Sequence, residues 1–215
     1  MKKFRDWYQK GYVTTQELSG GYTSELFTMA ETDKGNSYMS IGSSAGATHQ
    51  RPDKVDGAYP FDVGITTIPQ MDANNAKVIS QGPSLCIFKK ADPQEVLASW
   101  LFVKYLTTTV EFQAEFSMAS GYVPVIKSVG DNAVYASFLE SADGGDAISA
   151  LSAKVCLQQE SAYYTSPAFN GSSVARDQVG LLMQACLSSD AAGDVDAMIA
   201  KVFADAVAEC EYQAG

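Results

Sequence analysis

Gln81-Gly82-Pro83-Ser84-Leu85-Cys86-Ile87-Phe88 couples a polar glycine turn to an apolar run that is typical of a short β-strand. Asp92-Pro93-Gln94-Glu95 follows and predicts the start of a helix, because Asp is a favourable N-cap and proline fits the first helical turn. Gly121-Tyr122-Val123-Pro124-Val125 then predicts a rigid turn. Nothing in these segments is typical of an acid, base or nucleophile, so they favour binding over catalysis.

The surrounding pattern alternates strands with helices. Residues 37–41 alternate in polarity like a strand, and residues 85–88 form the next strand. The helix after Asp92 carries an apolar face broad enough to lie on a sheet, formed by Val96, Leu97, Trp100, Leu101, Val103 and Leu106. A second helix begins near Thr109 and stops at Gly121, and the last two helices cover about 174–188 and 194–210. This order predicts an α/β fold.

Length and charge limit the functions that the chain can have. Its 215 residues suffice for one large domain or two small ones. The net charge of -10 is spread along the chain and repels polyphosphate backbones, so nucleic acid is not an expected partner. No apolar run approaches the length of about 20 residues that spans a bilayer, and the first residues do not form a signal peptide.

Cysteine and histidine usage predicts neither a metal site nor a cofactor. Cys86, Cys156, Cys186 and Cys210 are widely separated, and His49 is the only histidine. Buried free thiols are the expected state of the cysteines. One long-range disulfide is the alternative if the protein is exported.

One motif raises an enzymatic alternative. Gly42-Ser43-Ser44-Ala45-Gly46 matches G-x-S-x-G and follows the strand predicted at 37–41, as the nucleophile elbow of a serine hydrolase does. An elbow also needs a helix directly after it and a later histidine, whereas His49 lies five residues from Ser44 and a loop follows. The order of a catalytic triad cannot be met, so a polar strand exit facing a cleft is the preferred interpretation.

Four places could form a ligand shell. Ser43 and Ser44 lie at a strand exit, Gly82 and Ser84 offer backbone N–H groups, Tyr122 lies in the Tyr-Pro turn, and Arg176 lies near a helix start. A guanidinium at a helix N-terminus can bind phosphate or carboxylate in a bidentate way. The alternative for Arg176 is a surface salt bridge.

A family resemblance rests on four segments. They are Phe61-Asp62-Val63-Gly64-Ile65 with Ile68-Pro69, Gly82 to Lys89, Ala98-Ser99-Trp100-Leu101-Phe102-Val103-Lys104-Tyr105-Leu106-Thr107, and Gly121 to Val125. In this order and spacing they resemble family 1 extracellular solute-binding proteins of ABC importers, the group that includes maltose-binding and glycerol-3-phosphate-binding proteins. The glycerol-3-phosphate-binding branch is the most similar one, and its cleft corresponds to Ser44, Gly82, Tyr122 and Arg176 here.

The resemblance implies a type II periplasmic-binding fold of two α/β lobes that close around a solute in the cleft between them. The chain then corresponds to the C-terminal portion: 1–61 as a second-lobe segment, 62–120 as an excursion into the first lobe, and 121–215 as the C-terminal helices of the second lobe.

The same resemblance implies an extracellular or periplasmic protein that is not an enzyme. It would capture glycerol 3-phosphate, another phosphorylated polyol or a sugar and deliver it to ABC permease subunits. Its link to the membrane would be a lipid anchor, as in a lipoprotein, that this chain does not contain. A sensor ectodomain of the same fold is a further alternative.

Overall fold

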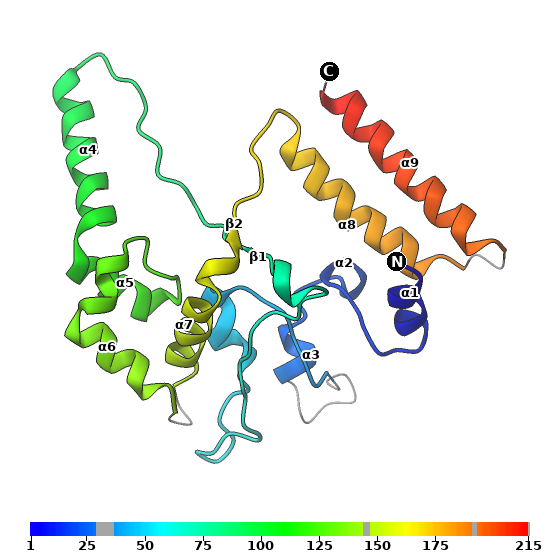
Figure 1. Ribbon diagram of the computed structural model, residues 1–215, viewed down its shortest axis with the longest axis horizontal. Helices are drawn as coiled ribbons and strands as arrows, with labels where there is room; N and C mark the ends of the chain where they lie inside the picture. The colour runs from blue at the N-terminus through cyan, green and yellow to red at the C-terminus, as the bar shows by residue number, and fades with distance from the viewer. Residues whose placement is uncertain (29–36, 144–146, 191–192, 215) are drawn as a thin grey trace. The chain divides into compact units, whose positions relative to one another are not determined.

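The computed structural model describes residues 1–28, 37–143, 147–190 and 193–214. Over this part of the chain the protein is rich in helix and has one small parallel sheet (Figure 1). The chain divides into two compact units. Unit 1 comprises Met1–Thr23 and Pro167–Gly215, and unit 2 comprises Ser24–Ser166. The N-terminal and C-terminal segments of the chain therefore fold together.

Unit 1 is made of helices, and α8 is the helix that contacts all the others. Its helices are α1 (Lys2–Gln9), α2 (Gln16–Ser19), α8 (Ser172–Ser188) and α9 (Val195–Ala214). α8 packs against each of the other three, and it runs beside α9 in Figure 1. Cys186 and Leu187, at the end of α8, are fully buried. The two terminal helices that the sequence predicts are confirmed.

Arg5 joins α1 to the end of α8. It is only 5% exposed, and its guanidinium donates hydrogen bonds to the carbonyl oxygens of Leu187 at 3.4 Å and Ser189 at 2.5 Å. The last carbonyls of a helix have no intrahelical donor, and this end of the helix carries partial negative charge. The buried cation is therefore placed where both its charge and its donors are satisfied.

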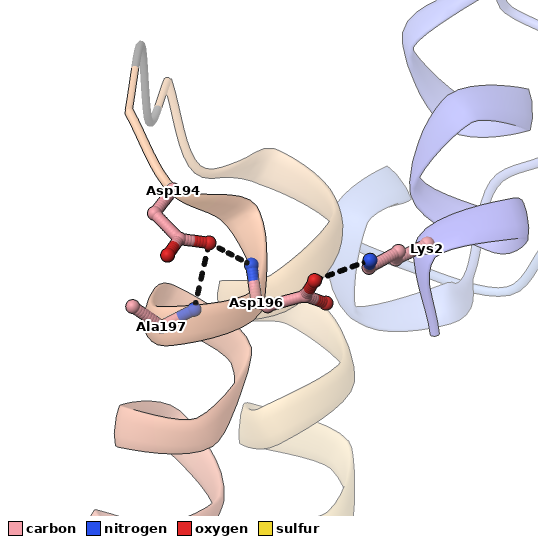
Figure 2. A network of polar contacts seen from close by, with 4 residues as sticks. All are labelled: Lys2, Asp194, Asp196 and Ala197. Atoms are coloured by element: carbon pink, nitrogen blue, oxygen red, sulfur yellow. Dashed lines mark hydrogen bonds and ion pairs between the residues drawn. The ribbon is translucent and has the colours of Figure 1, made fainter.

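The start of α9 is fixed by local polar contacts, which Figure 2 shows. The side chain of Asp194 accepts hydrogen bonds from the backbone N–H groups of Asp196 at 2.9 Å and Ala197 at 3.2 Å. This is N-capping by a carboxylate. The Asp196 carboxylate in turn pairs with Lys2 of α1 at 2.5 Å, with both side chains well exposed. An exposed pair of this kind contributes little stability, whereas the cap defines where the helix begins.

Unit 2 contains the sheet and most of the short elements. Its helices are α3 (Ser24–Thr28), α4 (Pro93–Thr108), α5 (Val110–Ser120), α6 (Ala133–Glu140) and α7 (Ile148–Gln158), and its strands are β1 (Val78–Ile79) and β2 (Tyr163–Tyr164). Its 3-10 helices are η1 (Ser44–Gln50), η2 (Ala73–Asn75), η3 (Lys127–Asp131), η4 (Ser141–Asp143) and η5 (Glu160–Ala162).

The core of unit 2 lies between α5, η3 and α6. Ala114, Val129 and Tyr135 are its buried members, contributed by these three elements in that order. Partly buried residues packed against them are Val110, Met118, Ile126, Phe138, Leu139 and Leu157. This cluster anchors α5 in the core of unit 2, and the turn at residues 121–125 directly follows α5.

The sheet differs from the predicted one. β1 and β2 pair in parallel, with Val78 opposite Tyr163 and Ile79 opposite Tyr164. The strands predicted at 37–41 and 85–88 are wrong, because both segments are irregular in the structure. An apolar or alternating pattern predicts which side chains of a strand would be buried. A strand also needs a neighbouring strand to form hydrogen bonds with its backbone groups, and the pattern does not show whether one exists. Tyr38 is 96% exposed and Phe88 is 81% exposed, so both segments lie in solvent instead.

The helix start at Asp92 is confirmed, whereas the predicted burial of that helix is wrong. The Asp92 side chain accepts a hydrogen bond from the Gln94 N–H at 2.8 Å, and Pro93 is the first helical residue. All residues of α4 are described, and none is buried. Leu97, Trp100 and Leu101 are each more than half exposed. The predicted apolar face has no sheet beneath it, because the strands that would form that sheet are absent from the described segments.

Candidate functional site

Ser44 lies at the start of a short helix that is held by two neighbours. η1 packs against α3 and α7, and Ala47 in η1 is buried. Ser43 precedes η1 with extended backbone and is exposed, while Ser44 is half-buried. The two serines therefore stand at the exit of an extended segment, but that segment is not a strand.

The hydroxyl of Ser44 faces a thiol. The Ser44 side chain interacts with the thiol of Cys156 in α7 and favours its ionised form. Burial raises the pKa of the Cys156 thiol, and hydrogen bonds with Ser152, Ser44 and Tyr163 offset part of this rise. The thiol therefore stays protonated at neutral pH, and Ser44 has a neutral partner.

Gly121 brings the Tyr-Pro turn against Ser44. Gly121 ends α5 in the left-handed conformation, with φ of 76°, and its N–H donates to the Ser117 carbonyl. A Cβ atom on Gly121 would lie 2.8 Å from the carbonyl oxygen of Ser44 and 3.3 Å from the Cα of Ala45. Only a residue without a side chain fits this approach. Two of the predicted ligand-binding places, Ser43-Ser44 and Tyr122, are therefore neighbours.

The Tyr122 ring is held on one side and open on the other. It stacks on Phe116 of α5, with ring centroids 6.3 Å apart and the planes at 18°. Phe116 stacks in the same way on Phe112, at 5.8 Å and 17°. Tyr122 is nevertheless 39% exposed. The ring can therefore contact a ligand while its position is fixed by α5.

Gly82 and Ser84 lie in an exposed, irregular segment between β1 and α4. A Cβ atom on Gly82 would meet nothing within 4 Å. Among the described residues, no hydrogen bond joins either position to Ser44 or Tyr122. Packing therefore does not require a glycine here, and the backbone N–H groups of Gly82 and Ser84 form no hydrogen bond within the described residues.

Arg176 belongs to unit 1 and lies early in α8. The helix begins after Gly171, which has φ of 91° and caps it without a side chain. Arg176 is exposed, and it forms no hydrogen bond or ion pair with any residue that the structure describes. The surface salt bridge that was the alternative role for Arg176 is therefore not formed with any described residue. The first backbone N–H groups of α8 lie within the preceding turn of the helix.

The surroundings of Ser44 do not resemble a nucleophile elbow. No strand precedes it in residues 37–43, and it begins a 3-10 helix. The side chain of His49 is exposed, and the polar partner of Ser44 is Cys156. No group of three or more His, Cys, Asp or Glu residues among those described could hold a metal ion.

The four cysteines are all free thiols in the structure. Cys186 is buried, and Cys156 and Cys210 are half-buried. Cys86 is exposed, so the expectation of four buried thiols is wrong at this position. The reason is the same as for residues 85–88 as a whole, which lie in solvent without a partner strand.

Sequence reasoning missed the residues that support the site. Gln113 and Ser117 are buried polar side chains on α5, and Cys156 is the partner of Ser44. The signal available for the first two was their spacing: residues four apart share one face of a helix, and this face is otherwise apolar. The contact of Cys156 with Ser44 spans 112 positions (156 − 44), and no local pattern predicts it.

A comparison with protein families matches residues 1–139 to the bacterial extracellular solute-binding proteins. This match covers more than half of the chain, and the protein belongs to that family. Members of the family act in extracellular solute binding for ABC transport and are generally not enzymes. The helix-rich α/β fold with its small parallel sheet is compatible with this class.

Comparisons with curated proteins and with solved structures returned no match. Family membership places the protein outside the cell or in the periplasm. Among the described residues, no helix has both the length and the apolar character that crossing a bilayer requires.

Proposed function

We propose that this solute-binding protein captures a small polar solute, either glycerol 3-phosphate or another phosphorylated polyol or a neutral sugar, and delivers it to ABC permease subunits. The observation that carries the proposal is the contact between Gly121 and Ser44. It joins a hydroxyl-bearing helix start to a partly exposed tyrosine ring that is fixed in place. Such a pair supplies both kinds of contact that polar organic solutes need, hydrogen bonds and an apolar face.

Ser43, Ser44 and Tyr122 are proposed to contact the solute directly. Ser43 is exposed and Ser44 half-buried, so their hydroxyls can donate to and accept from hydroxyl groups of a polyol or sugar. Gly82 and Ser84 are proposed to add backbone N–H donors, which their exposed segment leaves open. Pro83 between them has no N–H to offer.

Arg176 favours a phosphorylated solute over a neutral one. Its guanidinium has no ion-pair partner among the described residues, and it lies at the N-terminal part of a 17-residue helix. Phosphate oxygens match both the fork of the guanidinium and the free N–H groups of a helix start. In a protein of net charge -10, a local cation of this kind is needed to offset the repulsion of an anion.

The lobe assignment remains part of the proposal. Residues 62–120 are proposed as the first-lobe segment, with 1–61 and 121–215 belonging to the second lobe of a type II periplasmic-binding fold. The apolar and exposed surface of α4, within 62–120, is what a segment that packs against another body would carry. A lipid anchor is the proposed link to the membrane, and mass spectrometry of the protein isolated from its own membranes would detect the acyl chains.

Isothermal titration calorimetry of the chain with glycerol 3-phosphate and with maltose tests the proposal. We expect saturable binding of one of them, and we expect Tyr122→Ala to weaken it. If glycerol 3-phosphate is the solute, Arg176→Ala lowers its affinity by about tenfold, since it removes a charge-assisted contact, and Arg176→Lys lowers it less. An unchanged affinity for glycerol 3-phosphate in Arg176→Ala would rule out the phosphate assignment. Failure of both solutes to bind would contradict the proposed ligand class.

A further inference from the structure

The turn that carries Tyr122 is tied to α5 by two buried polar side chains. Gln113 is 8% exposed and Ser117 is 3% exposed, although both lie among apolar neighbours. A buried polar side chain costs free energy unless it is hydrogen-bonded, so its partners show what it does. Both residues form hydrogen bonds with backbone groups, Ser117 also contacts the Tyr135 hydroxyl, and each of the two has a backbone partner in the turn.

Ser117 holds the carbonyl of Tyr122 itself. Its hydroxyl donates to that oxygen at 2.5 Å, and it also lies 3.3 Å from the hydroxyl of the fully buried Tyr135. The Tyr135 ring belongs to the core of unit 2. The Tyr122 backbone is therefore connected, through one buried serine, to the buried core of unit 2.

Gln113 holds the far side of the same turn. Its side-chain oxygen accepts a hydrogen bond from the N–H of Val125 at 3.0 Å, and its side-chain nitrogen donates to the carbonyl of Leu106 at 2.5 Å. One amide thus bridges the end of α4 and the end of the turn. Gln113 and Ser117 lie one helical turn apart on α5. Ser117 is bonded to residue 122 and Gln113 to residue 125, so the two side chains restrain both ends of the turn.

We infer that Gln113 and Ser117 are positioning residues for Tyr122, and that they set the affinity of the site by holding the 121–125 turn against Ser44. This inference rests on the proposed function, since it assumes that Tyr122 contacts the solute. Beyond that function, Gln113 and Ser117 determine the affinity of the site without contacting the solute themselves. Phe116 restrains the ring, and these two residues restrain the backbone beneath it.

A double-mutant cycle separates positioning from general stability. Calorimetry with glycerol 3-phosphate and with maltose is done on the wild type, Ser117→Ala, Tyr122→Ala and the double variant. We expect Ser117→Ala to weaken binding about fivefold to tenfold, the effect of one buried hydrogen bond. In the Tyr122→Ala background the same change should alter binding less than twofold, because the ring that the restrained backbone positions is gone. Equal weakening in both backgrounds, or no weakening, would overturn the inference.

Three further variants serve as controls. Ser99→Ala removes a hydroxyl that donates to the Glu95 carbonyl at 2.8 Å on the exposed α4, and it should leave binding unchanged. Ser117→Thr keeps the hydroxyl and should restore affinity. If Ser117→Ala does not fold, Gln113→Met serves in its place, since it keeps the chain length and removes both hydrogen bonds.

A second measurement decides the inference when neither solute binds the wild type, an outcome that would count against the proposed function alone. Amide order parameters from NMR report directly on the turn. We expect the amides of residues 121–123 and of Val125 to be rigid in the wild type, at about 0.85, and to fall toward about 0.6 in Ser117→Ala and Gln113→Met while α5 stays unchanged; Pro124 has no N–H. Order parameters that stay high in both variants would show that these side chains do not hold the turn.

Discussion

Gly121 approaches Ser44 so closely that a methyl group on Gly121 would lie 2.8 Å from the Ser44 carbonyl oxygen. The two residues are 77 positions apart (121 − 44), and one ends α5 while the other begins η1. Through this contact the turn that bears Tyr122 meets the two serines of the candidate site. The backbone of Gly121 is also left-handed, so both space and conformation require glycine there.

Gly121→Ala is predicted to cost more stability than an alanine at a comparable helix end. Gly20 ends α2 with φ of 74°, close to the 76° of Gly121, but a Cβ atom there would meet nothing within 4 Å. Gly20→Ala should therefore lower the free energy of unfolding by about 1–2 kcal/mol, the conformational cost alone. Gly121→Ala should cost about 1–3 kcal/mol more, because Ser44 must move. Urea unfolding measures both, and equal costs would show that the close approach is not restrictive.

The sequence predicted the helices of this protein better than its sheet. Asp92-Pro93 and Gly121 mark helix ends through local chemistry, and both are found where that chemistry places them. The strand pairing of Val78 with Tyr163 is set by contacts between distant segments. Residues 85–88 have the composition of a strand but no partner among the described residues, and composition alone cannot show that.

Arg5→Met is predicted to destabilise the protein more than the loss of an exposed lysine. The change removes the hydrogen bonds of a buried guanidinium to the carbonyls of Leu187 and Ser189. We expect a loss of about 1.5–3 kcal/mol, the range for hydrogen bonds of charged groups. Lys10→Met is the control. Its ion pair with Asp6 is about half exposed, so its loss should cost less than about 0.5 kcal/mol. Chemical denaturation that finds similar costs would contradict this role of Arg5.

Tyr163 is predicted to contribute to unfolding at alkaline pH. Burial, followed by the nearby Cys156 and Glu160, raises the pKa of Tyr163 from 10.0 to about 12. Its hydroxyl also donates to the Cys156 carbonyl at 2.6 Å, which a phenolate cannot do. Because the folded pKa is the higher one, the neutral form stabilises the fold below pH 10, and this contribution is lost as pH rises through about 12.

The test is the slope of stability against pH between 10 and 12. Tyr163→Phe should lower stability at neutral pH and flatten this slope, since the titrating group is removed. Tyr164→Phe, at the exposed neighbouring position, should leave the slope as it is. A slope that persists unchanged in Tyr163→Phe would assign the alkaline transition to other groups.

The candidate site could be predicted in part. Ser44 and Tyr122 were both predicted from local features, a strand exit and a Tyr-Pro turn. The structure places their segments together, but their part in binding stays a prediction. Their neighbour relation could not be derived, because it depends on how η1 packs on α7 and on the left-handed end of α5. Gly82, Ser84 and Arg176 were also predicted from local features, and their part in binding stays a prediction in the same way.

The most direct test of solute binding at Ser44 and Tyr122 is an NMR titration of the isotope-labelled chain with glycerol 3-phosphate and, separately, with maltose. If the account is correct, one solute shifts the amide signals of Ser43, Ser44, Gly121 and Tyr122 in a saturable manner, and Tyr122→Ala weakens that response. Saturable shifts confined to other residues, or none with either solute at millimolar concentration, would contradict it.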